Sequence, residues 1–148
     1  LVTNGPARDI YGVVINLDNK KVDIEGTYKQ RLALRKERLG GKEPEVDTRK
    51  RAGIPSSGHP LGEYLQVADS GSESFVQCTW CGEKLCPADA VWKDIVVNRK
   101  VSVAESGPLR RDSGQFFMLE FLCPRCATQL DVDVVYDDDS PLYDEVYR

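Results

Sequence analysis

Two short cysteine turns of identical spacing constrain this chain more than any other feature. Cys78-Thr79-Trp80-Cys81 and Cys123-Pro124-Arg125-Cys126 each place two thiols three positions apart. This spacing lets a tight turn direct both sulfurs at one point, so two such turns supply the four soft ligands of a tetrahedral zinc site. Gly82 follows the first turn, where a residue free to adopt positive φ is useful, and Ala127 fills the matching place after the second. The motifs predict a metal site that organises the fold.

A fifth cysteine, Cys86, leaves the ligand set open. Turn chemistry selects Cys78 as the partner of Cys81, but the sequence also permits Cys81 and Cys86 as the first pair. Three ligands are therefore defined, and the fourth is either Cys78 or Cys86. An odd number of cysteines arranged as C-x-x-C pairs favours metal binding over disulfides in a reducing compartment. The candidate metal ligands are four of the following five: Cys78, Cys81, Cys86, Cys123 and Cys126.

The expected metal is Zn²⁺ in a structural role. Four thiolates leave no open coordination position, so such a site stabilises folding, by ~10–16 kcal/mol in small zinc domains, and performs no chemistry. Iron fits the same tetrahedron and is an alternative. A redox dithiol requires a C-x-x-C at a helix N-terminus within a βαβ unit, and neither motif has those surroundings.

The net charge of −4 hides two oppositely charged regions. Residues 29–51 contain nine Lys or Arg and four Asp or Glu, which makes +5 and leaves −9 for the rest of the chain. The acidic residues include Asp131, Asp133 and the run 137–139, which would repel phosphates around the metal site. We therefore expect no nucleic-acid partner, and a basic segment that docks on an acidic protein surface.

Membrane insertion and export are not expected. No stretch approaches the roughly 20 apolar residues of a membrane span, and the amino terminus lacks the features of a signal peptide. We expect a cytoplasmic protein.

The first 63 residues read as an extended arm. Residues 11–17 predict a strand, which a turn at 18–20 joins to a partner strand around Val22 and Ile24 as a hairpin. A basic helix is expected from Thr27, as N-cap, to Leu39, with Gly40-Gly41 as its stop. Residues 40–63 are rich in Gly and Pro and bury little, so they predict a linker.

Residues 64–148 read as a zinc-binding β domain. Strands are expected at 61–67, 73–77, 95–103, 116–122 and 130–136, with a helical turn at 87–93 and a loop at 105–114. The last two strands flank the second cysteine turn as a hairpin, and an acidic tail follows. The predicted fold class is mainly β with a little α: a zinc-ribbon-like antiparallel β domain carrying an N-terminal arm with one hairpin and one helix.

No catalytic machinery is recognisable. The single histidine, His59, lies in the linker between Gly58 and Pro60, where a solvent-exposed residue is expected. The chain has no glycine-rich phosphate loop, no G-x-S-x-G and no His-bearing metal motif. Trp80 and Trp92 are interpreted as packing residues. We expect no catalytic residues and no cofactor-binding residues other than the metal ligands.

Four stretches of the second half of the chain carry a likeness to a known family: Cys81-Gly82-Glu83-Lys84-Leu85-Cys86, Trp92-Lys93, Glu120-Phe121-Leu122-Cys123-Pro124-Arg125-Cys126 and Gln129-Leu130-Asp131-Val132-Asp133-Val134. Through them the sequence from Cys78 onward resembles the small zinc-containing subunit of the ATP-dependent ketone carboxylases, the acetone carboxylase gamma-subunit family with its acetophenone carboxylase relatives. The acetone branch carries cysteines matching Cys81, Cys86, Cys123 and Cys126, but not reliably Cys78, so the resemblance favours Cys86 as a ligand.

The resemblance implies a subunit of a hetero-oligomeric ligase that joins a ketone and bicarbonate, with ATP, to a β-keto acid. ATP, the divalent cation and the substrate chemistry would belong to large hydantoinase/oxoprolinase-like partner subunits. A shorter insertion between the cysteine pairs and a shorter tail favour the acetophenone type. The alternatives are a stand-alone zinc ribbon that binds nucleic acid or protein, and a small redox or iron protein.

Overall fold

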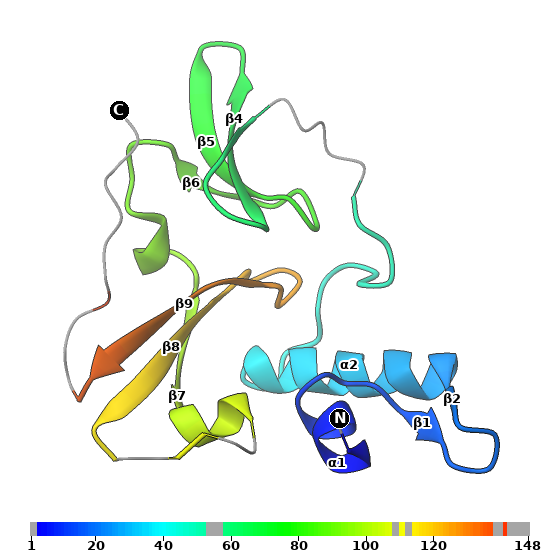
Figure 1. The fold of residues 1–148 in the computed structure, drawn as a ribbon. Helices are drawn as coiled ribbons and strands as arrows, with labels where there is room; N and C mark the ends of the chain where they lie inside the picture. The colour runs from blue at the N-terminus through cyan, green and yellow to red at the C-terminus, as the bar shows by residue number, and fades with distance from the viewer. Residues whose placement is uncertain (1–2, 53–57, 108–109, 112–113, 138–140, 142–148) are drawn as a thin grey trace.

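The described part of the chain folds into three antiparallel β-sheets and two α-helices. A computed structural model describes residues 3–52, 58–107, 110–111, 114–137 and 141. Within these ranges the sheets contain two, four and three strands (Figure 1). The predicted fold class, mainly antiparallel β with a little α, is confirmed. Parts of the expected linker and acidic tail, at 53–57, 138–140 and 142–148, lie outside the described residues.

The four-stranded sheet leads into the first cysteine turn. Its strands, in the order β3-β4-β5-β6, are β3 (His59–Pro60), β4 (Leu65–Ser70), β5 (Glu73–Cys78) and β6 (Lys84–Pro87). The strand expected at 61–67 instead begins at Leu65, because the backbone N–H groups of Leu61 and Gly62 both donate to its carbonyl and close a turn. His59, expected in a linker, pairs with Val67 as part of β3.

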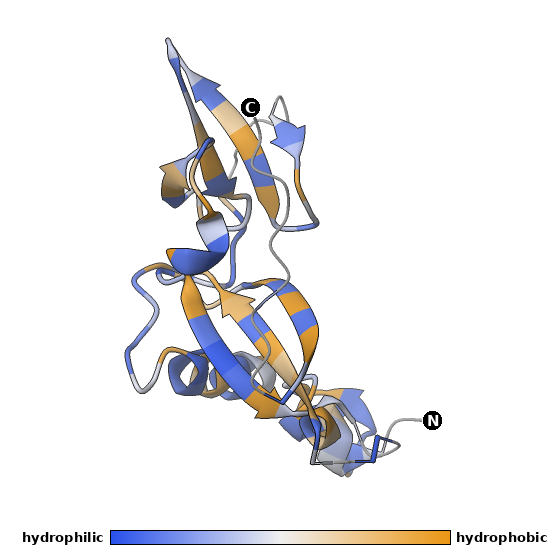
Figure 2. Ribbon diagram, turned by 90° about the vertical axis from the view of Figure 1, so that its left-hand side faces the viewer, coloured by the Kyte–Doolittle hydropathy of each residue, from blue (hydrophilic) through white to orange (hydrophobic). Residues whose placement is uncertain are grey.

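The three-stranded sheet carries the second cysteine turn between two of its strands. It has the order β7-β8-β9, with β7 (Val97–Ser102), β8 (Phe116–Leu122) and β9 (Gln129–Tyr136). The predicted hairpin of residues 116–122 and 130–136 is confirmed, with Phe116 opposite Tyr136. β8 is apolar except for Glu120, whereas polar and apolar residues alternate over residues 129–134 of β9 (Figure 2).

The buried face of β9 departs from the alternation expected from its sequence. Val134 and Tyr136 are exposed, at 60% and 48%, whereas Asp133 and Val135 are buried. Asp133 can lie inside because Lys93, itself 2% exposed, places its ammonium 3.1 Å from both carboxylate oxygens. A buried carboxylate needs such a partner, which an alternating pattern does not reveal.

Two short 3₁₀ helices flank β7. The first, η1 (Trp92–Asp94), is shorter than the helical turn expected over 87–93, because Pro87 still belongs to β6. The second, η2 (Val103–Ser106), ends β7 earlier than expected. A capping box starts it: the Ser102 hydroxyl accepts from the Ala104 N–H, and Glu105 reaches back to the Ser102 backbone.

The N-terminal segment contains α1 (Asn4–Asp9), which was not expected, and a hairpin of β1 (Ile15–Asn16) and β2 (Lys21–Val22). The hairpin is confirmed, but its first strand is shorter than the predicted 11–17. Gly12 turns the chain at φ +61° against α2, so residues 11–14 are not strand.

Helix α2 (Ile24–Arg38) begins earlier than predicted. Its N-cap is Asp23, whose carboxylate accepts from the Gly26 N–H at 2.9 Å. Thr27, expected as the cap, lies inside the helix, and its hydroxyl accepts from the Val14 N–H. The predicted stop is confirmed, since Gly40 and Gly41 both have positive φ. Thr27 is the only buried residue of this helix.

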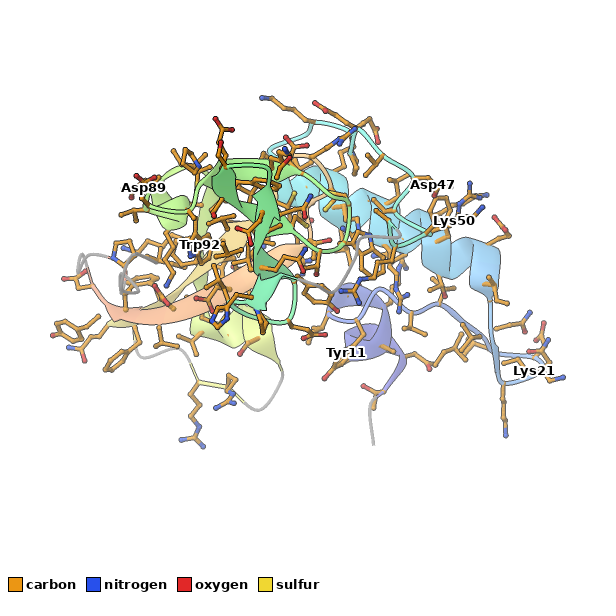
Figure 3. The ribbon with its side chains drawn as sticks, turned by 90° about the horizontal axis from the view of Figure 1, so that it is seen from above. Tyr11, Lys21, Asp47, Lys50, Asp89 and Trp92 are labelled. Atoms are coloured by element: carbon orange, nitrogen blue, oxygen red, sulfur yellow. The ribbon has the colours of Figure 1, made fainter. Side chains whose placement is uncertain are left out.

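The core lies where the two larger sheets meet. It contains four of the five cysteines, and Trp92 packs edge-on against Phe121 with ring centroids 5.8 Å apart. Trp92 lies among the strands, whereas Lys21 lies at the far end of the hairpin (Figure 3). The clustered core residues are Leu65, Val76, Cys78, Cys86, Trp92, Val96, Phe121, Cys123, Cys126 and Leu130.

No α-helix within the described ranges has the length and apolar character needed to cross a bilayer.

Candidate metal centre

The structure brings four thiols together at the junction of the two sheets. The sulfurs of Cys78, Cys81, Cys123 and Cys126 all lie within 4.8 Å of one another. Cys78 and Cys126 sulfurs are 3.9 Å apart, and Cys81 and Cys123 sulfurs are 3.7 Å apart. Four sulfurs bound at about 2.3 Å in a tetrahedron are separated by ~3.8 Å. The cluster therefore has the dimensions of a tetrathiolate metal site.

The two cysteine turns have the same backbone hydrogen bonds. In the first, Cys78 N–H donates to the Glu83 carbonyl and Gly82 N–H donates to the Cys78 carbonyl, each at 2.9 Å. In the second, Cys123 N–H donates to the Thr128 carbonyl and Ala127 N–H to the Cys123 carbonyl, again at 2.9 Å. Each cysteine pair is thus held by a closed hairpin turn.

The residue after each turn has the left-handed conformation that the sequence suggested. Gly82 has φ +80° and Ala127 has φ +55°. A glycine adopts this conformation without strain, and an alanine adopts it at a cost of roughly 1–2 kcal/mol. Ala127 is held there in a fully buried position beside the metal ligands.

Cys86 lies outside the sulfur cluster. It is part of β6, opposite Val76 of β5, and its side chain is mostly buried. Burial raises the pKa of the Cys86 thiol, and the nearby Asp89 carboxylate raises it further. Of the two candidates for the fourth position, the structure places Cys78 with the other three sulfurs and Cys86 elsewhere.

As free thiols, the four clustered cysteines differ in pKa. Hydrogen bonding with Cys123 holds the pKa of Cys126 well below its usual range, and the reciprocal bond raises the pKa of Cys123. Four sulfurs this close cannot all carry negative charge without a cation among them. A divalent metal would replace the shared protons, so that its binding releases them.

A guanidinium from the N-terminal arm lies beside the second turn. Arg35 Nη1 donates to the Cys126 carbonyl and, at 3.1 Å, to the Thr128 hydroxyl oxygen. That hydroxyl lies 3.2 Å from the Cys126 sulfur. The guanidinium also lies 5.8 Å from the centre of the Trp80 ring. Burial lowers the pKa of Arg35, and the neighbouring Cys126 opposes this shift.

Sequence patterns did not reveal this arginine. Arg35 is 91 residues from Cys126, on a helix whose other basic residues look the same in sequence. Nothing in local spacing distinguishes it. Thr128 had a weak signal, since a hydroxyl two residues after a ligand can reach the sulfur.

Outside the sulfur cluster, the described side chains that were candidates for catalysis or binding are held in ion pairs, lie on the surface or are buried in the core. Arg99 contacts Glu37 at 3.1 Å, Glu105 at 3.4 Å and Glu120 at 3.0 Å. These residues surround a cavity between α2 and the β7-β8-β9 sheet. His59 is exposed on β3, in agreement with its expected exposure. Trp92 is buried in the core, as expected of a packing residue.

Comparison with known families gives one match. The family model described as the acetone carboxylase gamma subunit matches residues 58–144, which include all five cysteines. No curated protein matches the chain.

Proposed function

Because the chain belongs to the acetone carboxylase gamma subunit family, we propose that it is the zinc-bearing, non-catalytic subunit of an ATP-dependent ketone carboxylase complex. The matched residues cover more than half of its 148 residues and the whole candidate metal centre. The reaction of such a complex joins a ketone and bicarbonate to a β-keto acid. The observation that carries the proposal is the tetrahedral spacing of four sulfurs inside the matched region.

The proposed ligands of the zinc ion are Cys78, Cys81, Cys123 and Cys126. Sulfur separations of 3.7 and 3.9 Å support this set. Four thiolates fill the coordination sphere of zinc, so the ion would stabilise the fold without binding a substrate. The family resemblance favoured Cys86, but its position outside the cluster supports Cys78 as the fourth ligand.

Metal analysis of two serine variants tests the ligand set. We expect one zinc per chain in the wild-type protein and in Cys86→Ser, and loss of zinc from Cys78→Ser. The opposite result would establish Cys86 as the fourth ligand. A coloured protein that contains iron and no zinc would contradict the identity of the metal.

The absence of an evident active site in the described part of the chain supports a non-catalytic role. There, Lys93 is paired with Asp131 and Asp133, Arg99 is surrounded by carboxylates, and His59 lies at the surface. We place ATP, its divalent cation and the ketone on large hydantoinase/oxoprolinase-like subunits of the same cytoplasmic complex. The complex would be a ligase and a hetero-oligomer.

Residues 1–63 are the proposed partner-binding arm, and residues 64–148 the zinc-binding β domain. The arm exposes large apolar side chains at Leu17, Val22 and Ile24, at 69%, 54% and 77%. Leu17 and Val22 belong to the β1-β2 hairpin, and Ile24 is the first residue of α2, whose later turns fall in the +5 segment. Apolar side chains grouped on a surface commonly mark a protein interface.

Co-purification tests the role of the arm. We expect the triple variant Leu17→Ser, Val22→Ser, Ile24→Ser to retain zinc but to lose the large subunits. The control is Val134→Ser, which removes an exposed apolar side chain from β9 instead. Full recovery of the complex with the triple variant would contradict the proposed interface.

The acetophenone type is the proposed substrate class. The isolated complex, supplied with ATP and bicarbonate, should form benzoylacetate from acetophenone faster than acetoacetate from acetone. A preference for acetone would move the chain to the acetone type, and failure to carboxylate either ketone would contradict the proposed reaction.

A further inference from the structure

The arm is attached to both cysteine turns at the residues that a metal would hold in place. At the second turn, Arg35 donates to the Cys126 carbonyl and to Thr128, and the Glu45 N–H donates to the Arg125 carbonyl at 2.9 Å. The three acceptor residues, Arg125, Cys126 and Thr128, lie within four consecutive positions of the second turn.

The same arm holds the first turn through a second arginine. Arg51 donates to the Thr79 carbonyl at 3.1 Å and to the Thr79 hydroxyl at 3.0 Å. The next residue, Ala52, donates its N–H to the Trp80 carbonyl at 2.7 Å. Thr79 and Trp80 are the two residues between the first pair of cysteines. Residues 35–52 therefore bridge the two turns from outside.

These attachments act beside side-chain packing, because Val46 of the arm contacts the core and Leu39 and Thr48 are buried. Only Thr27 of α2 is buried, and the ion pair that joins α2 to β7, between Glu37 and Arg99, has an exposed carboxylate. The loop after α2 lies beside that helix, where Asp47 and Lys50 are visible in Figure 3, and Arg49 stacks on Tyr28 at 4.8 Å. That stacking joins the arm to itself and not to the β domain.

From this arrangement we propose that metal occupancy governs the docking of the N-terminal arm, with Arg35 and Arg51 as the positioning residues. The inference rests on the proposed zinc site. One ion bound by both turns would fix the separation of two hairpins that belong to different sheets, and the carbonyls that accept from the arm are part of those turns. Loss of the ion would separate the acceptors and release the arm.

The formal charge of an occupied metal site would also favour docking of the arm. A divalent cation bound by four thiolates would carry a formal charge of −2, which a neighbouring guanidinium offsets. The guanidinium of Arg35 approaches the site at Cys126, and the Thr128 hydroxyl connects it to the sulfur. With a thiolate at Cys126, this hydroxyl donates to the sulfur and accepts from Arg35. The arm thus completes the hydrogen bonding of a metal-bound ligand.

Thermodynamic linkage makes the effect reciprocal: if zinc promotes docking of the arm, the docked arm must tighten zinc binding by the same factor. The apolar surface around the hairpin would then be presented to the large subunits in a fixed position only by the zinc-loaded chain. Metal supply would control assembly of the complex.

Chelator competition on the full chain tests the reciprocal effect. We expect Arg35→Gln to weaken zinc binding about tenfold or more, as expected when a group that supports a metal ligand is removed. The matched control is Lys29→Gln, which removes the same charge from an exposed position on the same helix and should bind zinc as the wild type does. Arg35→Lys, which keeps one charged donor, should recover part of the affinity.

Amide hydrogen exchange tests the docking itself. The N–H groups of Glu45 and Ala52 should exchange at least tenfold faster in zinc-loaded Arg35→Gln than in zinc-loaded Lys29→Gln, while amides of β8 and β9 stay protected in both. This comparison needs no metal-free protein, so unfolding on metal removal cannot obscure it.

Equal zinc affinity and equal protection of Glu45 and Ala52 in the two variants would overturn the coupling and leave the zinc site intact. A wild-type chain that binds no zinc would overturn both the coupling and the proposed function.

Discussion

At the scale of single residues, the position of Cys86 separates it from the other cysteines in reactivity. Its thiol is outside the sulfur cluster, and burial raises its pKa above that of a free thiol, about 8.5. Alkylation of the zinc-loaded chain should therefore label Cys86 alone and slowly. The labelling rate should level off at a higher pH than the rate for a free thiol does, because the raised pKa delays formation of the reactive thiolate.

Mass spectrometry of the labelled chain measures this outcome. After chelation and unfolding, all five cysteines should react, and Cys86→Ser should remain unlabelled while zinc is bound. Labelling at Cys78 in the zinc-loaded protein, with Cys86 protected, would contradict the assignment of the ligands.

The ion pair between Lys93 and Asp133 joins two buried charges in the core. Lys93 is 2% exposed and Asp133 is 7% exposed, and Lys93 also pairs with Asp131, so it is removal of Lys93 that leaves the Asp133 carboxylate buried without its ammonium partner. We expect Lys93→Met to lower the free energy of unfolding by about 3–5 kcal/mol. The double variant Lys93→Met, Asp133→Leu should recover much of this loss, because no charge remains uncompensated.

Urea unfolding with saturating zinc measures both variants. A surface substitution changes the free energy of unfolding by about 0.5 kcal/mol or less. If Lys93→Met lowers it by no more than that, the buried ion pair is not needed for stability.

At the scale of secondary structure, the cap of α2 fixes where the arm changes from hairpin to helix. The Asp23 carboxylate accepts from the Gly26 N–H, and the Asp23 N–H donates to the Val14 carbonyl at 2.9 Å. We expect Asp23→Ala to destabilise the first turn by about 1 kcal/mol, and Asp23→Asn to retain most of the cap. Local opening free energies from hydrogen exchange of the first helical amides measure the effect, and equal values for the two variants would contradict the role of the cap.

The elements that the sequence predicted best are those with a strong local signal. The hairpin around the second cysteine turn combines alternating residues with a metal motif, and both strands formed as expected. The start of α2 was misplaced because Asp23 and Thr27 are both good caps, and Gly26 between them disfavours the earlier start. The competition is settled by tertiary contact, since the Thr27 hydroxyl bonds with Val14.

The metal centre was predictable as a pair of turns but not as four named ligands. The choice between Cys78 and Cys86 depends on the register of β5 and β6, which pairs Cys86 with Val76 and points the end of β5 at the second turn. The hydrogen bonds of Arg35 and Arg51 to the cysteine turns could not be predicted from the sequence, because each joins segments far apart in the chain.

At the scale of the whole molecule, two sheets and a basic arm meet around one cluster of sulfurs. The four-stranded sheet, the three-stranded sheet and α2 radiate from this region (Figure 1). The core that surrounds it is small and contains the cysteines themselves. A metal there would join the two larger sheets through their cysteine turns, and the exposed apolar side chains of the arm would lie away from that junction.

Native mass spectrometry of the complex purified from its source through this chain tests the central claim most directly. We expect a hetero-oligomer with one zinc for each copy of this chain, bound to large subunits that carboxylate a ketone with ATP. Recovery of the chain as a free, metal-free monomer would contradict it.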